Sequence, residues 1–233
     1  FKKHLVDDQL INQFYEGEEI IFEKDDGVFF PNQFLMLVSN SNEKKSALAK
    51  FVNYHSKLER VVETKDTVWG LRPRNKEQTF AIDLLNDPIV PIVTLVGKAG
   101  CGKTLLAIAA GLDQVLEKRM FKKLIVSRPI QPLGKDIGYL PGTMEEKMRP
   151  WLMPIQDNID FLLNGNSKSM EMFFDDGTIQ VEALTYIRGR SISNAYVIID
   201  EAQNLTTHEL KTIITRVGEN TKIVLTGDVE QID

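Results

Sequence analysis

Residues 97–104 read Gly97-Lys98-Ala99-Gly100-Cys101-Gly102-Lys103-Thr104 and fill every fixed position of the pattern G-x-x-x-x-G-K-[ST]. Two different periodicities flank this pattern. Residues 92–96 form a short apolar, β-branched run of the kind found in buried parallel strands. Residues 103–116 carry apolar side chains at helical spacing, as in a helix that packs on a sheet. A strand, a glycine-rich loop and a helix N-terminus together aim backbone N–H groups at one point, which predicts a phosphate-binding loop rather than a structural turn.

The composition is that of a soluble globular protein with one large domain or two unequal ones. Of its 233 residues 42% are hydrophobic and 26% are charged, enough for a core that needs no disulfides. The single cysteine, Cys101, fits a reducing compartment, so we expect a cytoplasmic location. No apolar run is long enough to span a membrane, and the first residues do not resemble a signal peptide. The formal charge of -5 argues against a protein that binds nucleic acid through its net charge alone. A local basic face remains compatible with this charge.

Residues 1–70 carry short strand-like runs separated by turn signals, which predicts a small β-rich module. The expected strands are 19–23, 28–30, 34–38, 47–54 and 58–63. A helix over residues 43–54 is the alternative for that segment. The module is rich in aromatic residues, which we expect in its core, with base stacking in a nucleic-acid site as the second interpretation. These residues are Phe29, Phe30, Phe34, Phe51 and Tyr54.

Residues 71–233 show strands alternating with helices, which predicts an α/β fold with a mostly parallel sheet covered on both faces. The expected strands are 92–96, 123–127, 196–200 and 222–226. The expected helices are 76–85, 103–116, 145–163 and 207–217, the third interrupted by two prolines. The last helix begins with Thr206 and Glu209 at the spacing of a capping box. Residues 128–144 are rich in proline and glycine and read as a loop.

Four side chains around the loop indicate nucleotide chemistry. Lys103 would place its ammonium group against the outer phosphates, and the Thr104 hydroxyl would bind Mg²⁺. Asp200 and Glu201 follow a buried strand, so they emerge at the carboxyl edge of the sheet, where open α/β folds bind ligands. Asp200 would hold the metal through its water shell, and Glu201 would orient and deprotonate the attacking water. Mg²⁺ and a nucleoside triphosphate are therefore the expected cofactors.

Two glutamines extend this site. Gln231 lies in a polar segment, residues 226–231, that follows the strand at 222–226, and there it would contact the γ-phosphate or the water. Gln78 opens the helix that precedes the loop, and its amide offers the donor and the acceptor needed to read an adenine edge. Taken alone, each would be an ordinary polar surface residue.

These residues together resemble a known family. Gln78, the loop at 97–104, Asp200-Glu201-Ala202-Gln203 and Gly227-Asp228-x-x-Gln231 are similar to the ordered nucleotide-site motifs of superfamily 1 helicases. More closely, residues 69–233 resemble the PhoH family of phosphate-starvation-associated ATPases, through the segments 127–129, 138–151 and 182–190. Residues 1–70 are similar to the region that joins a PIN ribonuclease domain to the ATPase in one branch of that family.

The resemblance implies a RecA-like core that binds ATP through residues 97–104 and Gln203 and hydrolyses it with Mg²⁺. It also implies a ring-shaped homo-oligomer, with a hexamer as the best match, and single-stranded RNA as the partner. Arg190 would then reach phosphate, either that of RNA or the γ-phosphate of a neighbouring subunit's ATP, whose charge it would stabilise across the interface. Pairing of this arginine with surface acids is the alternative. The family's sequence continues where this chain ends, so we expect further chain after Asp233, and we expect no nuclease activity from residues 1–233, which include no PIN domain.

Three functions fit these motifs. The first is ATP hydrolysis that drives RNA remodelling or unwinding, coupled to RNA degradation in the full-length protein. The second is a nucleotide-gated module that binds RNA or protein and hydrolyses ATP slowly, as a timer. The third, a small-molecule kinase, is disfavoured by Glu201, because a kinase must avoid activating water.

Overall fold

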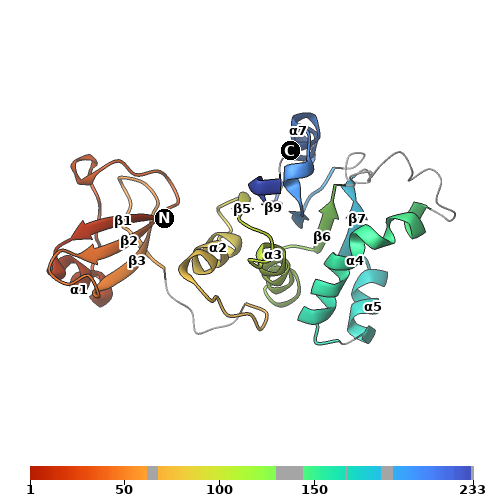
Figure 1. Cartoon of the computed structure of the whole chain (residues 1–233), viewed down its shortest axis with the longest axis horizontal. Helices are drawn as coiled ribbons and strands as arrows, with labels where there is room; N and C mark the ends of the chain where they lie inside the picture. The colour runs from red at the N-terminus through yellow and green to blue at the C-terminus, as the bar shows by residue number, and fades with distance from the viewer. Residues whose placement is uncertain (62–67, 130–143, 166, 185–190, 232–233) are drawn as a thin grey trace. The chain divides into compact units, whose positions relative to one another are not determined.

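The computed structural model describes residues 1–61, 68–129, 144–165, 167–184 and 191–231. The chain forms two compact units. The smaller comprises Phe1–Lys65 and Pro73–Asp83, and the larger comprises Asp66–Arg72 and Leu84–Asp233. In Figure 1 the strands of the smaller unit are red to orange, and those of the larger unit run from yellow-green to blue. Within the described ranges, no helix has both the length and the apolar composition that a bilayer-spanning segment requires.

The smaller unit is built on a four-stranded sheet with the order β1-β2-β3-β4. Its strands are β1 (Lys2–Val6), β2 (Gln33–Ser39), β3 (Ser46–Phe51) and β4 (Glu59–Arg60). The pair β1-β2 is parallel, whereas β2-β3 and β3-β4 are antiparallel. The strand predicted over residues 47–54 is therefore confirmed against the helical alternative. A β-rich module is present as predicted.

Helix α1 (Asp8–Glu16) was not predicted, and it covers this sheet. Its sequence signals are local. Asp8 lies in the first turn, Ile11 and Phe14 are buried at helical spacing, and Gly17 ends the helix in the left-handed conformation, with a φ of 87°. The predicted strands at 19–23 and 28–30 were wrong, because neither segment joins the ladder. Residues 19–23 accept backbone bonds outside the ladder, from Leu58 N–H to Ile20 O at 2.7 Å and from Asp26 N–H to Glu23 O at 3.2 Å.

The aromatic residues of the smaller unit mostly fill its core, as expected. Phe29, Phe34 and Phe51 are buried, and Phe34 stacks on Phe80 with ring centroids 4.4 Å apart. Tyr54 accepts a hydrogen bond from Phe29 N–H through its hydroxyl group. Only Phe30 among the five is exposed, so the base-stacking interpretation loses most of its candidates. The core interpretation is confirmed for the three buried rings.

The larger unit is an α/β fold around a five-stranded, wholly parallel sheet with the order β5-β9-β8-β6-β7. Its strands are β5 (Ile92–Val96), β6 (Lys123–Arg128), β7 (Ile179–Ala183), β8 (Ala195–Ile199) and β9 (Lys222–Gly227). Strand β8 is buried at all five positions, as a central parallel strand should be. Strand β9 lies between β5 and β8. The predicted fold class is confirmed.

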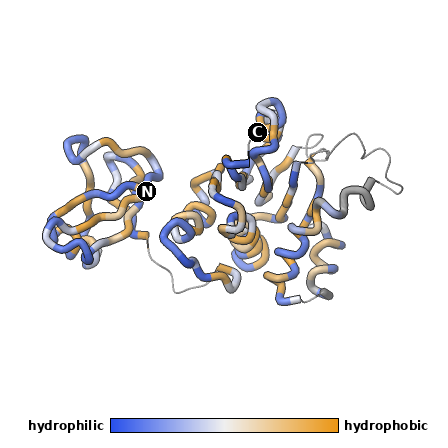
Figure 2. Tube along the Cα trace, viewed as in Figure 1, coloured by the Kyte–Doolittle hydropathy of each residue, from blue (hydrophilic) through white to orange (hydrophobic). Residues whose placement is uncertain are grey.

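Helices cover both faces of the sheet. These helices are α3 (Lys103–Leu112), α4 (Met144–Leu162), α5 (Ser167–Asp175) and α7 (Thr207–Arg216), whereas α2 (Lys76–Asn86) contributes residues to both units. Helix α3 is predominantly hydrophobic (Figure 2). It approaches the sheet so closely that a Cβ on Gly111 would lie 2.7 Å from Leu124 Cδ1. Ile213 of α7 packs instead with Ile125 and Val197. Since successive strand residues face opposite ways, α3 and α7 lie on opposite faces.

The remaining predicted elements are largely present. Helix α4 contains both Pro150 and Pro154, and α7 begins with the predicted capping box of Thr206 and Glu209. Helix α3 continues into a π-helical segment, η2 (Asp113–Glu117), which the sequence did not reveal. Neither α5 nor β7 was predicted. Most of the predicted loop, residues 130–143, lies outside the described residues.

Candidate nucleotide site

The loop between β5 and α3 is fixed to the neighbouring strand end. Gly97 N–H donates to Gly227 O at 3.2 Å, so the start of the loop continues the pairing of β5 with β9. Gly100 and Gly102 have φ values of 78° and 86°, which residues with a Cβ adopt only at a steric cost. Gly102 is also the N-cap of α3. The backbone thus curves around the N-terminus of that helix, where N–H groups attract anions.

Lys103 places its ammonium group inside this curve. Its Nζ donates to Gly97 O at 2.6 Å and to Lys98 O at 2.9 Å, and lies 3.8 Å from Cys101 Sγ. These contacts hold the charge over the loop rather than in solvent. Phosphate oxygens bound at the same point would meet this cation directly. The contact of Lys103 with the outer phosphates stays a prediction, and the position of its ammonium group is compatible with it.

Asp200 is the buried acid at the tip of β8, and three oxygens gather at it. Thr104 Oγ1 donates to its Oδ1 at 2.7 Å, and Thr226 Oγ1 donates to the same atom at 2.6 Å. Its backbone N–H donates to Ser127 O at 2.8 Å. Hydroxyl and carboxylate oxygens are the ligands that Mg²⁺ prefers, and one carboxylate suffices when phosphate and water complete the shell. Thr104 and Asp200 therefore fit the metal role predicted for them.

Glu201 follows directly and is held at both carboxylate oxygens. Its Oε1 accepts from Arg128 Nη2 at 3.2 Å, and its Oε2 accepts from Gln203 Nε2 at 2.6 Å. The backbone of Glu201 is left-handed, with a φ of 53°, which turns the chain sharply out of the strand. Both members of the Arg128–Glu201 ion pair are partly exposed. The sequence did not indicate that Arg128 would pair with Glu201.

These groups line one cavity of about 310 Å³. Its walls come from the loop, from the tips of β8 and β9 and from α4, which contributes Asn158. The structure thus brings together, in one enclosure, most of the residues that sequence analysis selected. Those that line it are Ala99, Gly100, Gly102, Lys103, Thr104, Asp200, Glu201 and Gln231. Asn158 and Thr226 were missed.

Asp228 is the centre of a network that joins β9 to the loop. Its Oδ2 accepts from Ala99 N–H and from Gln231 Nε2, each at 2.9 Å, and its Oδ1 accepts from Glu230 N–H at 3.0 Å. Burial alone would raise the pKa of Asp228. The hydrogen bonds from Glu230, Gln231 and Ala99, with the Lys103 charge, outweigh burial and hold the pKa below its ordinary value. Asp228 is therefore an anion that fixes both the loop and Gln231.

Gln203 connects this network to Glu201. Its Oε1 accepts from Asp228 N–H at 3.2 Å, while its Nε2 donates to Glu201. A Cβ at Gly227 would lie 3.0 Å from Gln203 Oε1, so glycine at the end of β9 permits this close approach. The sequence motifs contain every member of the network. Their connection to one another depends on the strand order, which places β9 beside β8.

Gln78 and Arg190, both predicted to take part in the site, are not placed at this cavity. Gln78 belongs to the smaller unit, where its Oε1 accepts from Arg74 N–H at 2.7 Å and its N–H donates to Asn75 Oδ1 at 2.8 Å. Its adenine contact stays a prediction. Arg190 lies outside the described residues, and its role stays a prediction as well.

The chain was compared with known proteins. Residues 70–233 match the family model described as PhoH-like protein. The chain is 50% identical over 236 residues to Protein PhoH2 of Bacillus subtilis (strain 168), covering 100% of this chain and 53% of that protein. It is 45% identical over 175 residues to Protein PhoH2 of Thermobispora bispora, covering 75% of this chain and 40% of the relative. The chain thus spans about half the length of the curated relatives it matches.

A solved structure named "The Phi-28 gp11 DNA packaging Motor" is similar to this chain with a TM-score of 0.31 and 15% sequence identity. The similar region covers 59% of this chain and 46% of the chain in that structure. That likeness is too weak to support an argument. The family match covers more than two-thirds of the chain and includes the phosphate-binding loop, both strand-tip acids and the segment that carries Asp228 and Gln231. This chain therefore belongs to the PhoH-like family and carries a P-loop of the kind that binds nucleotides.

Proposed function

We propose that the chain hydrolyses ATP with Mg²⁺ and uses the reaction to remodel single-stranded RNA. The observation that carries the ATPase part is the convergence of Lys103, Thr104, Asp200 and Glu201 on one cavity. A phosphate-binding loop alone would serve binding. The acid beside it adds a group that can take a proton from water.

Each side chain has a defined task in this proposal. Thr104 and Asp200 hold Mg²⁺, which neutralises charge on the β- and γ-phosphates when bound. The ammonium group of Lys103 and the loop N–H groups bind the phosphate oxygens. Glu201 accepts a proton as a water oxygen bonds to the γ-phosphorus and the bond to the β-γ bridging oxygen breaks. The products are ADP and inorganic phosphate. Gln231, held by Asp228, positions the water or senses the γ-phosphate.

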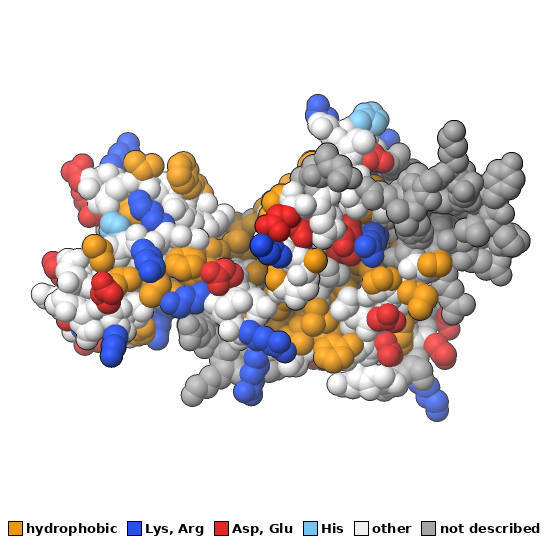
Figure 3. Space-filling model, in the orientation of Figure 1, with side chains coloured by type: hydrophobic (Ala, Val, Ile, Leu, Met, Phe, Trp, Pro, Cys, Tyr) orange, Lys and Arg blue, Asp and Glu red, His pale blue; other side chains and the backbone are white. Residues whose placement is uncertain are grey.

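RNA is proposed from the family and from the helicase-like order of the motifs, not from bulk charge. The chain carries a formal charge of -5. On the face drawn in Figure 3, basic and acidic side chains of the described residues are interspersed. We expect strand-tip residues such as Arg128 to make the contacts with the RNA backbone. The proposal also includes a cytoplasmic location, a hexameric ring, and coupling to RNA degradation in the full-length protein.

The test is steady-state ATP hydrolysis by the intact protein, with and without single-stranded RNA. We expect the rate to require Mg²⁺ and to rise when RNA is added, with separation of a tailed duplex in the same mixture. An ATPase rate that does not change when RNA is added would contradict the RNA part of the proposal and leave the ATPase part standing. No Mg²⁺-dependent turnover at all would remove both.

A second candidate function, a nucleotide-gated binding module with slow hydrolysis, is favoured by one observation. Both oxygens of Glu201 are already engaged, by Arg128 and by Gln203. Water must then compete with Arg128 and Gln203 for these oxygens. Turnover would then stay slow until Arg128 is drawn away, for example by an RNA phosphate. Nucleotide-dependent RNA binding without strand separation would support this function over the first.

Replacing Arg128 with glutamine separates these two functions. We expect the RNA-free ATPase rate to rise roughly fivefold, since a partly exposed ion pair contributes on the order of 1 kcal/mol. Stimulation by RNA should shrink, because the arginine that RNA would attract is gone. The measurement is the ATPase rate over a titration of single-stranded RNA. Arg216→Gln, at an exposed position on α7, is the matched control. A lower RNA-free rate in Arg128→Gln would mean that the arginine supports Glu201 instead of restraining it.

A further inference from the structure

The larger unit contains a second cavity, of about 640 Å³, away from the nucleotide site. The turn at Trp69 forms one wall, and the others come from the end of α3 with η2, the end of α4, and α5. Asp113 and Glu117 follow Lys103 by ten and fourteen residues along one continuous helical stretch. At 1.5 Å per residue they stand about 15–21 Å from it along the axis. The two cavities share no lining residue among those described.

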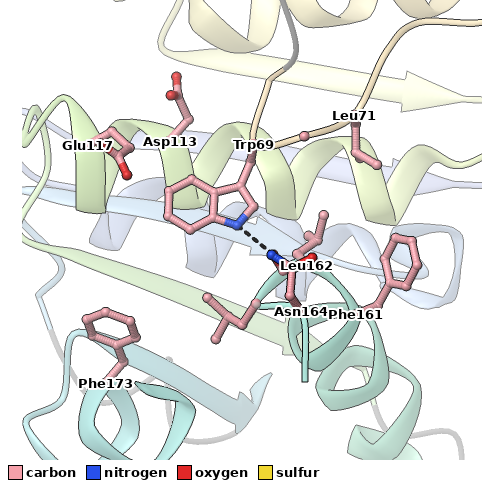
Figure 4. A pocket seen from close by; sticks show the side chains of 10 residues that line it. Trp69, Leu71, Asp113, Glu117, Phe161, Leu162, Asn164 and Phe173 are labelled. Carbon is pink, nitrogen blue, oxygen red and sulfur yellow. Dashed lines mark hydrogen bonds between the residues drawn. The ribbon is translucent and has the colours of Figure 1, made fainter. Parts of the chain in front are cut away.

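Trp69 is built into this cavity at a conformational cost. Val68 and Leu71 exchange two backbone hydrogen bonds of 3.0 Å, so Trp69 and Gly70 form a two-residue turn. Both have positive φ, 48° and 79°. Turns of this kind prefer asparagine or glycine at the first position, and a bulky residue there is an outlier. The Trp69 indole N–H donates to Leu162 O at 2.9 Å, which fixes the ring (Figure 4). The turn conformation disfavours tryptophan at position 69, so the contacts of its side chain are the reason for this residue.

The opposite wall carries negative charge. The π-helical bond from Lys118 N–H to Asp113 O, 2.8 Å long, widens the helix at the cavity. Such widened turns occur often at functional sites. Asp113 pairs with Lys118 at 2.7 Å. Glu117 is exposed and has no ion-pair partner among the residues that the structure describes. Glu117 therefore offers a charge that a ligand can neutralise.

The remaining lining is aromatic and aliphatic. Phe161 and Phe173 line the cavity with Trp69, from α4 and α5 respectively, and Leu162 adds an apolar surface. Figure 4 shows Asp113 and Glu117 on the helix at one side of Trp69 and Phe173 across from them on α5. Aromatic faces attract cations, guanidinium groups in particular, and carboxylates add charge attraction. The same carboxylates repel phosphate-bearing molecules.

We propose that this cavity binds an alkyl guanidinium or alkyl ammonium group, with Glu117 as its counter-charge and Trp69 as its stacking surface. The alkyl stem would lie against Leu162. The same chemistry occurs in free diamines and guanidines and in the arginine or lysine side chain of a polypeptide. This site is separate from the ATPase proposal and does not depend on it.

The test is titration of the unmodified chain with agmatine, a four-carbon stem with a guanidinium group at one end and an ammonium group at the other, measured by calorimetry. Trp69 fluorescence in a Trp151→Phe background gives a second readout, because the chain has two tryptophans. We expect saturable binding with a Kd on the order of a millimolar, as suits so small a ligand. Butylurea, which is neutral, should bind at least tenfold more weakly. Equal binding of butylurea, or no saturable agmatine signal, would overturn the proposal.

Substitutions assign the site. Glu117→Gln should weaken agmatine binding at least fivefold, and Glu171→Gln, at an exposed position on α5, should leave it unchanged. Both variants must show the thermal midpoint of the unmodified chain. Unchanged binding in Glu117→Gln would place agmatine elsewhere and refute the site. A capped Gly-Arg-Gly peptide distinguishes the sources: binding at least tenfold tighter than agmatine indicates a polypeptide arginine, and weaker binding indicates a free small cation.

Discussion

Glu201→Gln should lower the ATPase rate about a thousandfold while leaving ATP binding within about twofold. A positioned general base contributes roughly 10²–10⁴ in rate, and an amide cannot accept the proton that the attacking water must lose. Glutamine keeps the size of the side chain and can still meet Gln203. The ion pair with Arg128 disappears, but a partly exposed pair contributes only about 0.2–1 kcal/mol. The fold and the phosphate loop should therefore persist.

The measurement combines phosphate release with equilibrium binding of a fluorescent ATP analogue. Glu230→Gln is the matched control, because its carboxylate follows the neighbouring strand β9, is exposed and pairs with Lys98. That control should hydrolyse ATP within about twofold of the unmodified rate. Turnover retained in Glu201→Gln would show that water is activated elsewhere, and the assignment of this acid would fall. Loss of ATP binding would instead show that Glu201 supports the loop.

Lys103→Ala should lose ATP binding itself, by about a hundredfold, and turnover with it. Hydrogen bonds to charged groups contribute about 1.5–3 kcal/mol each, and the ammonium group is the cation held inside the loop. Alanine also leaves the carbonyl oxygens of Gly97 and Lys98 pointing at the phosphates with no positive charge between them. Binding of the analogue and phosphate release should fall together, in contrast to Glu201→Gln.

Lys211→Ala serves as the control for the loss of one positive charge, since this lysine is exposed on α7. Its affinity for the ATP analogue should match that of the unmodified chain. If Lys103→Ala bound ATP normally, the loop at 97–104 would be a structural turn, and the nucleotide site would have to be sought elsewhere. Circular dichroism of each variant excludes a trivial loss through unfolding.

The local parts of the site were readable from the sequence because one short segment determines each of them. The loop at 97–104 needs only its glycines, its lysine and the flanking strand and helix. Asp200 and Glu201 follow a run so apolar that it had to be a buried strand. Helix α7 begins with a capping box that four residues define. The fold class followed from the alternation of such segments.

The contacts that complete the site were not readable, because they depend on which strands are neighbours. Thr226 meets Asp200 only because β9 pairs with β8 and sets Leu225 opposite Ile199. Arg128 and Glu201 are 73 residues apart in the sequence, where Arg128 ends β6 and Glu201 lies just after β8. Ala99 and Asp228 are likewise far apart in the sequence and meet only because β5 and β9 are neighbouring strands. Helix α1 was missed for a different reason. Its sequence signals are local, but they lie within a segment whose β-branched and aromatic runs favoured strands.

The left-handed backbone at Glu201 has a consequence for how such chains diverge. A residue with a Cβ costs about 1–2 kcal/mol in that conformation, whereas glycine adopts it freely. Drift towards greater robustness would therefore replace this acid with glycine or asparagine, unless hydrolysis is under selection. In a duplicated copy released from that selection, position 201 should be among the first to change. The residue at position 201 would then distinguish copies that still hydrolyse the nucleotide from copies that have lost this activity.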